Sequence, residues 1–158
     1  MTYSVRRATA DDLEILVQFN SNIALETEDK ILDKEILTRG VARAFEQGEE
    51  AKYFVAVPIE SPNGKPVGSL MLTREWSDWR DGWLAWIQSV YVDKEHRGQG
   101  VFRLLLDHAT KELQADPDVR GLRLYVENDN TSAQSVYERS GFIDPHYKVL
   151  EKLFEGDA

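Results

Sequence analysis

The order of hydrophobic and polar residues along the chain predicts strands that alternate with helices. Residues 3–8 alternate in polarity and predict a first strand. Apolar residues at helical spacing then predict two helices. The first follows Thr9 and Asp12, which have the spacing of a capping box, and the second ends near Gly48.

The middle of the chain predicts a hairpin followed by one long strand. Residues 53–59 and 67–73 are strand-like, and the breaker residues "SPNGKP" separate them. The stretch "WLAWIQSVYV", residues 83–92, predicts the long strand. Simple alternation puts Trp86, Gln88, Val90 and Val92 on one face of it.

The last third predicts two more strand and helix pairs. A glycine turn near residues 95–100 opens a helix with an apolar inner face, and residues 121–126 predict a strand. A short helix is capped by Asn130 and closed by Gly141, and residues 147–154 predict a last strand. The pattern predicts an α/β (α+β) fold in a single domain over residues 1–158.

Composition narrows the class of protein. The chain has 158 residues, of which 42% are hydrophobic and 30% charged, enough for one domain with a sizeable core. No apolar stretch approaches the roughly 20 residues of a membrane helix, and the first residues have no apolar signal core. There are no cysteines. We therefore expect a cytoplasmic protein with no membrane partner.

The net charge of −9 argues against binding to nucleic acid or anionic membranes, which requires neutralising phosphates. It favours cationic partners such as amines, or it serves only to keep the protein in solution. The three histidines have no metal-ligand spacing, so no metal site is expected.

The stretch "EHRGQGVFRLLL", residues 95–106, places two glycines at the mouth of a helix. A helix N-terminus has unpaired N–H groups and a partial positive charge, so it can bind a phosphate, and Gly98 and Gly100 would let that phosphate approach the backbone. The alternative is a plain turn. A dinucleotide fingerprint would need a third glycine where Arg103 stands, and the Gly-Lys-Ser/Thr of a P-loop is absent.

Two motifs give the chain a family resemblance. "VYVDKEHRGQG" resembles the acyl-CoA-binding motif of the GNAT superfamily of acetyl-CoA-dependent N-acetyltransferases, with Glu95 where Gln or Arg is usual and Phe102 where a small residue is usual. "NTSAQSVYERSGF", residues 130–142, resembles the family's downstream segment. The resemblance covers nearly the whole chain. It implies about four helices around a mixed sheet of six to seven strands, with two central parallel strands splayed apart.

The resemblance also implies a site for acetyl-CoA, the acetyl donor, between strands 83–92 and 121–126. The pyrophosphate would take backbone N–H groups of the turn, and the pantetheine arm would pair with the central strand. Asn130 would be a helix cap and also a cofactor contact. The implied cofactor-binding residues are Val90, Tyr91, Val92, Arg97, Gly98, Gln99, Gly100, Val101 and Asn130.

Tyr137 matches the family's general acid, which protonates the departing thiolate. Its spacing alone also suits a core tyrosine. A base for the incoming amine is harder to name. Gln88 stands on the central strand where some relatives carry a glutamate, and it cannot accept a proton, although it can hold a water. The acidic candidates are Glu26, Glu75, Asp78 and Asp81.

The acceptor end is predicted from "REWSDWRDGW", where Trp76 and Trp79 are interleaved with carboxylates, a mixture that suits an organic cation. The alternative is that these tryptophans pack on the sheet or at a subunit interface. By resemblance Glu26 lies in the acceptor pocket. The predicted substrate-binding residues are Glu26, Trp76, Trp79 and Gln88.

The pattern looks most similar to the branch of diamine and spermidine/spermine acetyltransferases, which implies a homodimer. Gln88 and Ser89 replace an acidic pair of that branch, so an amino acid or a smaller amine fits as well. We predict transfer of an acetyl group from acetyl-CoA to a primary amine of a small molecule. The alternatives are acetylation of a protein N-terminus or lysine, and a non-catalytic acyl-CoA-binding domain.

Overall fold

A computed structural model describes residues 2–61 and 63–155. The chain divides after Leu124 into two compact units, which are described here one at a time. The single domain over residues 1–158 stays a prediction. Within the described residues, no helix has both the length and the apolar composition that crossing a membrane requires.

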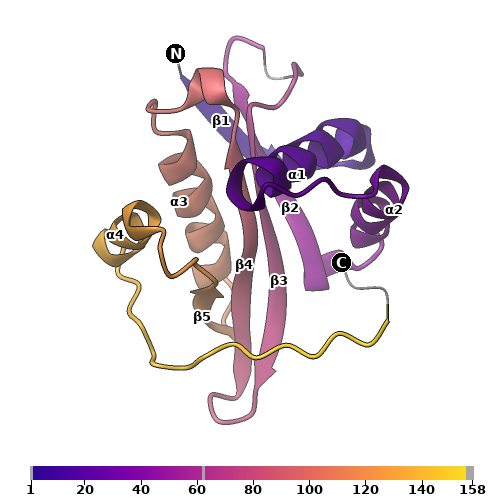
Figure 1. Ribbon diagram of the computed structural model, residues 1–158. Helices are drawn as coiled ribbons and strands as arrows, with labels where there is room; N and C mark the ends of the chain where they lie inside the picture. The colour runs from indigo at the N-terminus through magenta and orange to yellow at the C-terminus, as the bar shows by residue number, and fades with distance from the viewer. Residues whose placement is uncertain (1, 62, 156–158) are drawn as a thin grey trace. The chain divides into compact units, whose positions relative to one another are not determined.

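The first unit is built on one mixed sheet, with strand order β1-β2-β3-β4-β5 (Figure 1). The first four strands pair antiparallel, and β4 and β5 pair in parallel. The sheet confirms the predicted fold class and the predicted hairpin. Its strands are β1 (Tyr3–Arg7), β2 (Ala51–Pro58), β3 (Gly68–Ser77), β4 (Gly82–Val92) and β5 (Val119–Leu124).

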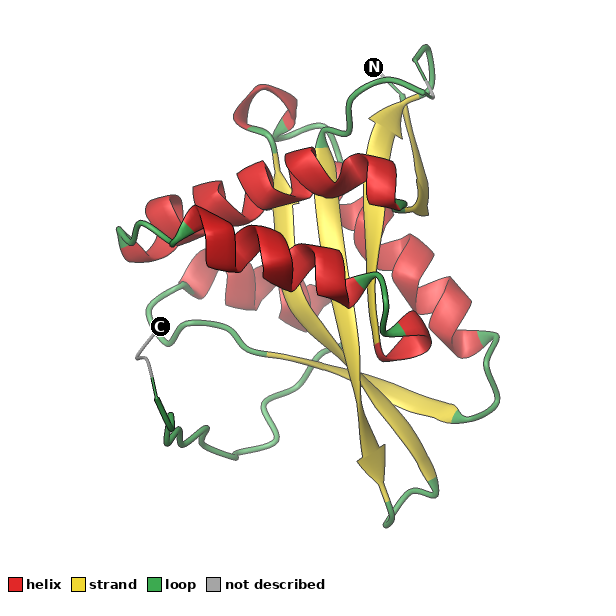
Figure 2. Ribbon diagram, turned by 90° about the vertical axis from the view of Figure 1, so that its right-hand side faces the viewer, coloured by secondary structure: helices red, strands yellow, loops and turns green. Residues whose placement is uncertain are grey.

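Helices cover both faces of this sheet (Figure 2). On one face lie α1 (Leu13–Glu28) and α2 (Lys34–Ala44), which pack with strand residues such as Tyr53 and Val55. On the other face lies α3 (Val101–Gln114), whose Leu105 and Ala109 are fully buried. Short 3-10 turns are η1 (Ala10–Asp12), η2 (Gly48–Glu50) and η3 (Lys94–His96). Apolar residues at helical spacing thus become the two core layers.

A bulge at Gln88 changes the two faces of β4. Met71 pairs with Ser89, but the next residue, Leu72, pairs with Ile87, so Gln88 is an extra residue without a partner on β3. One extra residue moves all later side chains to the opposite face. Trp86 therefore lies on the face of α1 and Val90 on the face of α3. The prediction that Trp86, Gln88, Val90 and Val92 share one face is wrong.

The two parallel strands separate next to this bulge. The last recorded pair between β4 and β5 is Ile87 with Leu124. β4 continues to Val92, and its residues 89–92 pair with β3. Residues 88–92 therefore have one edge that β5 does not use, which agrees with the expected splay. That open edge is where the candidate site lies.

The second unit holds α4 (Thr131–Arg139) and the residues that follow it. The Asn130 side chain accepts a hydrogen bond from the Ala133 N–H at 3.1 Å, which confirms the predicted cap. The predicted strand over residues 147–154 is wrong, since this segment joins no ladder in the described structure. Leu150 and Phe154 are about nine-tenths exposed, at 90% and 91%. The described sheet consequently has five strands where six to seven were expected.

The start of α1 is fixed by a buried carboxylate. Asp12 forms two bonds with the Arg6 guanidinium, at 2.8 and 3.0 Å, and accepts the Thr9 N–H at 2.8 Å, which is the Asp12 half of the predicted capping box. Hydrogen bonds from Arg6 lower the pKa of Asp12, against the effect of its burial, and the Thr9 N–H adds to the lowering. Asp12 is only 5% exposed.

We predict that Asp12→Asn lowers the free energy of unfolding by about 2 kcal/mol at pH 7, because it leaves Arg6 without its charge partner; partial exposure of Arg6 keeps the loss below that of a fully buried pair. A lowered pKa contributes stability above the unfolded-state pKa, near 3.9, and this contribution is lost as pH falls through the folded-state value. The difference between variant and wild type therefore shrinks below about pH 4. Urea unfolding at pH 7 and pH 3.5 measures both effects.

The matched control is Asp11→Asn, a neighbouring carboxylate that is exposed. It is expected to change stability by less than about 0.5 kcal/mol. Equal losses in the two variants would contradict the role of the Asp12 contacts.

Candidate functional site

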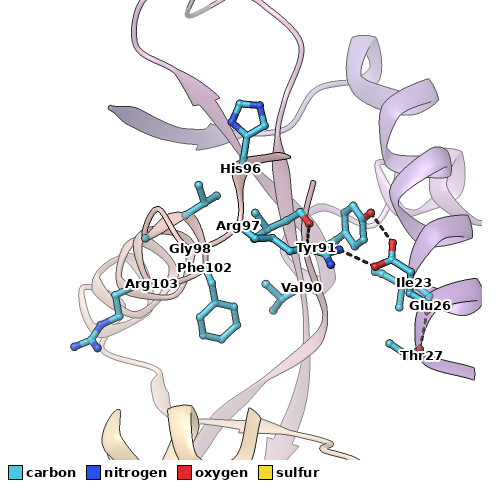
Figure 3. A pocket seen from close by; sticks show the side chains of 13 residues that line it. Ile23, Glu26, Thr27, Val90, Tyr91, His96, Arg97, Gly98, Phe102 and Arg103 are labelled. Carbon is cyan, nitrogen blue, oxygen red and sulfur yellow. Dashed lines mark hydrogen bonds and ion pairs between the residues drawn. The ribbon is translucent and has the colours of Figure 1, made fainter. Parts of the chain in front are cut away.

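A cavity of about 610 Å³ lies on the open edge of β4. The end of α1 contributes Ile23, Glu26 and Thr27 to its wall, and β4 contributes Val90–Val92. The rest of the lining comes from residues 96–98 and 100–103, at the glycine turn and the start of α3. Figure 3 shows the two walls facing each other across Val90, with Phe102 directed into the space between them and Arg103 directed away.

The glycine turn has the backbone conformation that its sequence predicts. Gly98 and Gly100 have φ of 75° and 83°, values that other residues rarely adopt. A Cβ placed on either glycine would meet no atom within 4 Å, so the space above the turn is open. The turn therefore offers bare backbone toward a ligand.

The Tyr3 side chain on β1 forms hydrogen bonds with two residues of this turn. Its hydroxyl donates to the Gln99 side-chain oxygen at 2.9 Å and lies 2.9 Å from Nδ1 of His96. The Tyr3 hydroxyl thus links the side chains of Gln99 and His96. Gln99 also donates to the Glu95 carbonyl at 3.3 Å. The predicted cofactor residue Gln99 thus has its side chain turned toward the protein.

The start of α3 supplies N–H groups for an anion. The first intrahelical bond runs from the Leu104 N–H to the Gly100 carbonyl at 3.0 Å, so the first turn of α3, which begins at Val101, has N–H groups that precede this bond. The Arg97 N–H, which the sequence assigned to the same role, instead donates to the Lys94 carbonyl at 3.4 Å. The start of α3 therefore suits an anion, and the part of the turn in cofactor binding stays a prediction.

The edge of β4 supplies backbone groups for an extended ligand. The Asp93 N–H donates at 2.8 Å to the carbonyl of Val67, which precedes β3. Successive residues of a strand direct their N–H and C=O groups to opposite sides, so Val90 and Val92 direct theirs away from β3. β5 does not reach this stretch. A chain with amide groups can therefore pair here as an additional strand would.

Three residues from distant parts of the sequence form one network across the cavity. Arg97 Nη2 donates to Glu26 Oε1 at 2.7 Å, and the Tyr91 hydroxyl donates to Glu26 Oε2 at 2.8 Å. Arg97 Nε donates to the Val92 carbonyl at 2.8 Å, and the Asn22 amide donates to the Tyr91 hydroxyl at 3.2 Å. These bonds join α1 to the glycine turn (Figure 3).

The network sets the charges on this side of the cavity. The Arg97 hydrogen bond, and after it the Tyr91 hydrogen bond, lower the pKa of Glu26, so Glu26 is a carboxylate at neutral pH. Burial, and after it the bond to Glu26, raise the pKa of the Tyr91 hydroxyl, so Tyr91 stays a donor. The sequence assigned Tyr91 and Arg97 to the site but gave no signal that their side chains meet Glu26.

The predicted residues of the central strand lie beside a second carboxylate. Glu75 on β3 accepts from the Trp86 ring nitrogen at 3.0 Å and from Arg123 on β5 at 2.8 Å. Gln88, at the bulge, donates to the Thr73 hydroxyl at 2.7 Å. Both Glu75 oxygens are thus engaged, and a role of Glu75 as the base stays a prediction.

The tryptophans of the hairpin lie far along β4 from the cavity. Trp76 pairs with Trp83 across the ladder, with ring centroids 5.0 Å apart, and Trp79 lies in the turn beyond them, 90% exposed. From Gly82 to Val90 is eight residues of extended chain, or about 27 Å. The structure does not bring Trp76 and Trp79 together with the cavity, and their role in acceptor binding stays a prediction.

Tyr137 and the cap residue Asn130 belong to the second unit. The Tyr137 ring packs edge-on against Phe142, with centroids 5.4 Å apart, and its pKa is raised by burial. The phenol is therefore protonated at neutral pH and able to donate. Its part in catalysis stays a prediction. In the described residues, no group of three or more His, Cys, Asp or Glu side chains is arranged to hold a metal ion.

Sequence and structure comparisons identify the family. Residues 19–142 match the model of the acetyltransferase (GNAT) family. A crystal structure of a possible acetyltransferase from Clostridium difficile 630 is 38% identical, with a TM-score of 0.88, and the alignment covers 99% of this chain and 100% of that one. The chain therefore belongs to the GNAT acetyltransferase family, whose acetyl donor is acetyl-CoA.

Two curated relatives match over shorter stretches. The peptidyl-lysine N-acetyltransferase YjaB of Salmonella typhimurium is 33% identical over 93 residues, which are 59% of this chain and 51% of that protein. A streptothricin acetyltransferase of Escherichia coli is 33% identical over 76 residues, 48% of this chain and 40% of that protein. The matches thus span about half of these relatives or less, and the two relatives are named for different acceptors.

Proposed function

We propose that this protein transfers the acetyl group of acetyl-CoA to a primary amine of a small molecule by direct attack. The observation that carries the proposal is the junction of two binding features in one cavity. The open edge of β4 at Val90 and Val92 suits the amide-containing pantetheine arm. The start of α3 with Gly98 and Gly100 suits the pyrophosphate.

In this proposal the residues of the chain position the thioester and stabilise charge. A backbone N–H on the free edge near Val90 polarises the acetyl carbonyl as negative charge develops on its oxygen. The amine nitrogen attacks the carbonyl carbon, the carbon–sulfur bond breaks, and the sulfur leaves with the electron pair. Tyr137 then gives a proton to that sulfur. The nitrogen loses one proton to solvent and the Tyr137 phenolate takes one up, so the products are the N-acetyl amine and the thiol, and the phenol is restored.

The incoming amine must lose its proton before it attacks. An alkylamine with a pKa near 10.4 costs roughly 4 to 5 kcal/mol to deprotonate at pH 7, whereas an α-amino group near 8 costs about 1 kcal/mol. Glu26 is the acidic candidate that lines the cavity. Both carboxylates have two donors in the described structure: Arg97 and Tyr91 for Glu26, and Trp86 and Arg123 for Glu75.

The net charge of the chain supports a cationic acceptor. The chain carries a net charge of −9, which favours a cationic amine over an anionic acceptor. A diamine or polyamine, as in the branch that the sequence resembles, and an amino acid are both consistent with this.

The homodimer that is typical of that branch remains part of the proposal. Light scattering, which measures the mass of the protein in solution, tests it.

A protein lysine is the second candidate. It is favoured by the relative that is named as a peptidyl-lysine N-acetyltransferase and by the exposed hairpin. An acceptor that spans both the cavity and Trp79 would have to be longer than about 27 Å, which a protein is and a small amine is not.

Thiol release from acetyl-CoA, measured over a panel of acceptors, tests the proposal. The panel contains diamines, polyamines, amino acids, streptothricin and a lysine-containing peptide. We expect turnover with at least one small amine and a lower kcat/KM for the peptide. Turnover of the peptide alone would replace the small-molecule assignment with the second candidate. CoA binding without any turnover would favour a non-catalytic domain.

A further inference from the structure

We propose that Arg97 and Glu26 form a latch that CoA opens, so that binding of the cofactor releases the Glu26 carboxylate for the cationic amine. This inference rests on the proposed function and adds an order of binding to it. Three observations carry it: the partners of Arg97, the place of Glu26 in the cavity wall, and the second support of Glu26 by Tyr91.

Bound CoA would compete for both hydrogen-bond acceptors of the Arg97 side chain, or for the side chain itself. Arg97 Nε donates to the Val92 carbonyl at 2.8 Å. This carbonyl lies on the free edge of β4, where an amide N–H of pantetheine would donate to it. Arg97 Nη2 donates to Glu26 Oε1 at 2.7 Å. Arg97 directly precedes Gly98, which belongs to the proposed anion site. A pyrophosphate at the start of α3 offers the guanidinium a stronger anionic partner with bidentate geometry.

The existing ion pair is weak enough to be exchanged. The side chains of Arg97 and Glu26 are 44% and 26% exposed, and ion pairs with such exposure contribute little to stability. The Arg97 guanidinium also lies 5.4 Å from the centre of the Tyr91 ring, at the cavity wall and outside the buried core. Opening the latch therefore disturbs no packed layer.

Glu26 stays in place when Arg97 leaves. The Tyr91 hydroxyl still donates to Oε2 at 2.8 Å, and the Asn22 amide supports that hydroxyl at 3.2 Å. Tyr91 is buried and packs against Phe19 of α1, with ring centroids 5.1 Å apart, so it is a fixed donor. Release of Arg97 thus converts a neutralised pair into a fixed carboxylate in the cavity wall. The amine site is then completed only after CoA is bound.

Calorimetry of CoA binding to four proteins tests the latch: wild type, Glu26→Gln, Arg97→Gln and the double variant. We expect Glu26→Gln to bind CoA roughly twofold to fivefold more tightly, since Arg97 no longer has to leave a carboxylate. In the Arg97→Gln background, the same change is expected to leave the CoA affinity within about 1.5-fold, because nothing is left to unlatch.

A through-space repulsion between Glu26 and the pyrophosphate is the competing explanation. It predicts that Glu26→Gln tightens CoA binding equally in both backgrounds, and that result overturns the latch. Glu28→Gln, an exposed carboxylate at the end of the same helix, is the matched control and is expected to change the affinity by less than about 1.5-fold. If wild type itself does not bind CoA, the proposed function fails. If it binds and Glu26→Gln gives no tightening, only the latch fails.

A second readout follows the carboxylate directly. Carbon-13 NMR of Glu26, assigned with the Glu26→Gln variant, gives its pKa with and without CoA. The groups that face Glu26 are Arg97, Lys94 and the Tyr91 hydroxyl. CoA is expected to raise the low pKa of Glu26 in wild type, and to raise it by a smaller amount in Arg97→Gln. A pKa that stays low with CoA bound means that Arg97 has not moved, and it overturns the proposal.

Discussion

Replacement of Tyr137 by phenylalanine is expected to lower kcat by roughly 10² or more, while the dissociation constant of CoA changes little. The change keeps the ring and its edge-on packing against Phe142 and removes only the hydroxyl. Without that hydroxyl the sulfur leaves as an unprotonated thiolate or takes a proton from water. Single-turnover kinetics shows whether the chemical step is the one that slows.

The pH profile gives a second test of the same role. Burial raises the pKa of the Tyr137 phenol above its ordinary value near 10. A general acid acts only below its pKa, so the rate that depends on it falls as pH rises through that raised value. The phenylalanine variant is expected to lose this basic limb. Tyr147→Phe, an exposed tyrosine of the same unit, is expected to keep both the rate and the limb.

More than about half of wild-type kcat in Tyr137→Phe, with chemistry rate-limiting, would contradict the general-acid role. Tyr137 would then be a packing residue, as its helical spacing alone also allows. Loss of stability in the variant would point the same way, and thermal unfolding of both tyrosine variants measures it.

Local signals in the sequence predicted the helices, the hairpin and the glycine turn. The positive φ of Gly98 and Gly100 depends on those two residues alone, and the Asn130 cap depends on residues next to it in the chain. A short sequence motif therefore holds enough information to predict each feature. The tryptophan hairpin is a case that such signals leave open. Its rings and carboxylates indicated an acceptor site, but the length of β4 places Trp79 far from Val90.

Features that depend on a distant partner could not be predicted. The bulge at Gln88 depends on the register of two strands, and no single residue marks it. Residues 147–154 alternate in polarity as a strand does. They form no strand in the described structure, because they pair with no neighbouring strand. The bond between Arg97 and Glu26 joins residues 71 apart in the chain. The sequence assigned both residues to the site, through the family resemblance, without relating them.

Replacement of Gly100 by glutamate is expected to weaken CoA binding at least tenfold, which is about 1.4 kcal/mol. The space above Gly100 is open, so the new side chain can enter the cavity without a clash with the protein. There it places a carboxylate where the pyrophosphate is proposed to lie, beside the first turn of α3. Calorimetry of CoA binding measures the change.

Backbone strain contributes to this result and has to be separated from charge. With φ at 83°, any residue other than glycine is strained at position 100 by about 1 to 2 kcal/mol. Gly100→Gln has nearly the same size and the same strain but no charge. We expect the glutamate variant to bind CoA several-fold more weakly than the glutamine variant, because only glutamate repels the pyrophosphate. Equal affinities in the two variants would assign the loss to shape alone, and an unchanged affinity in both would remove the turn from the cofactor site.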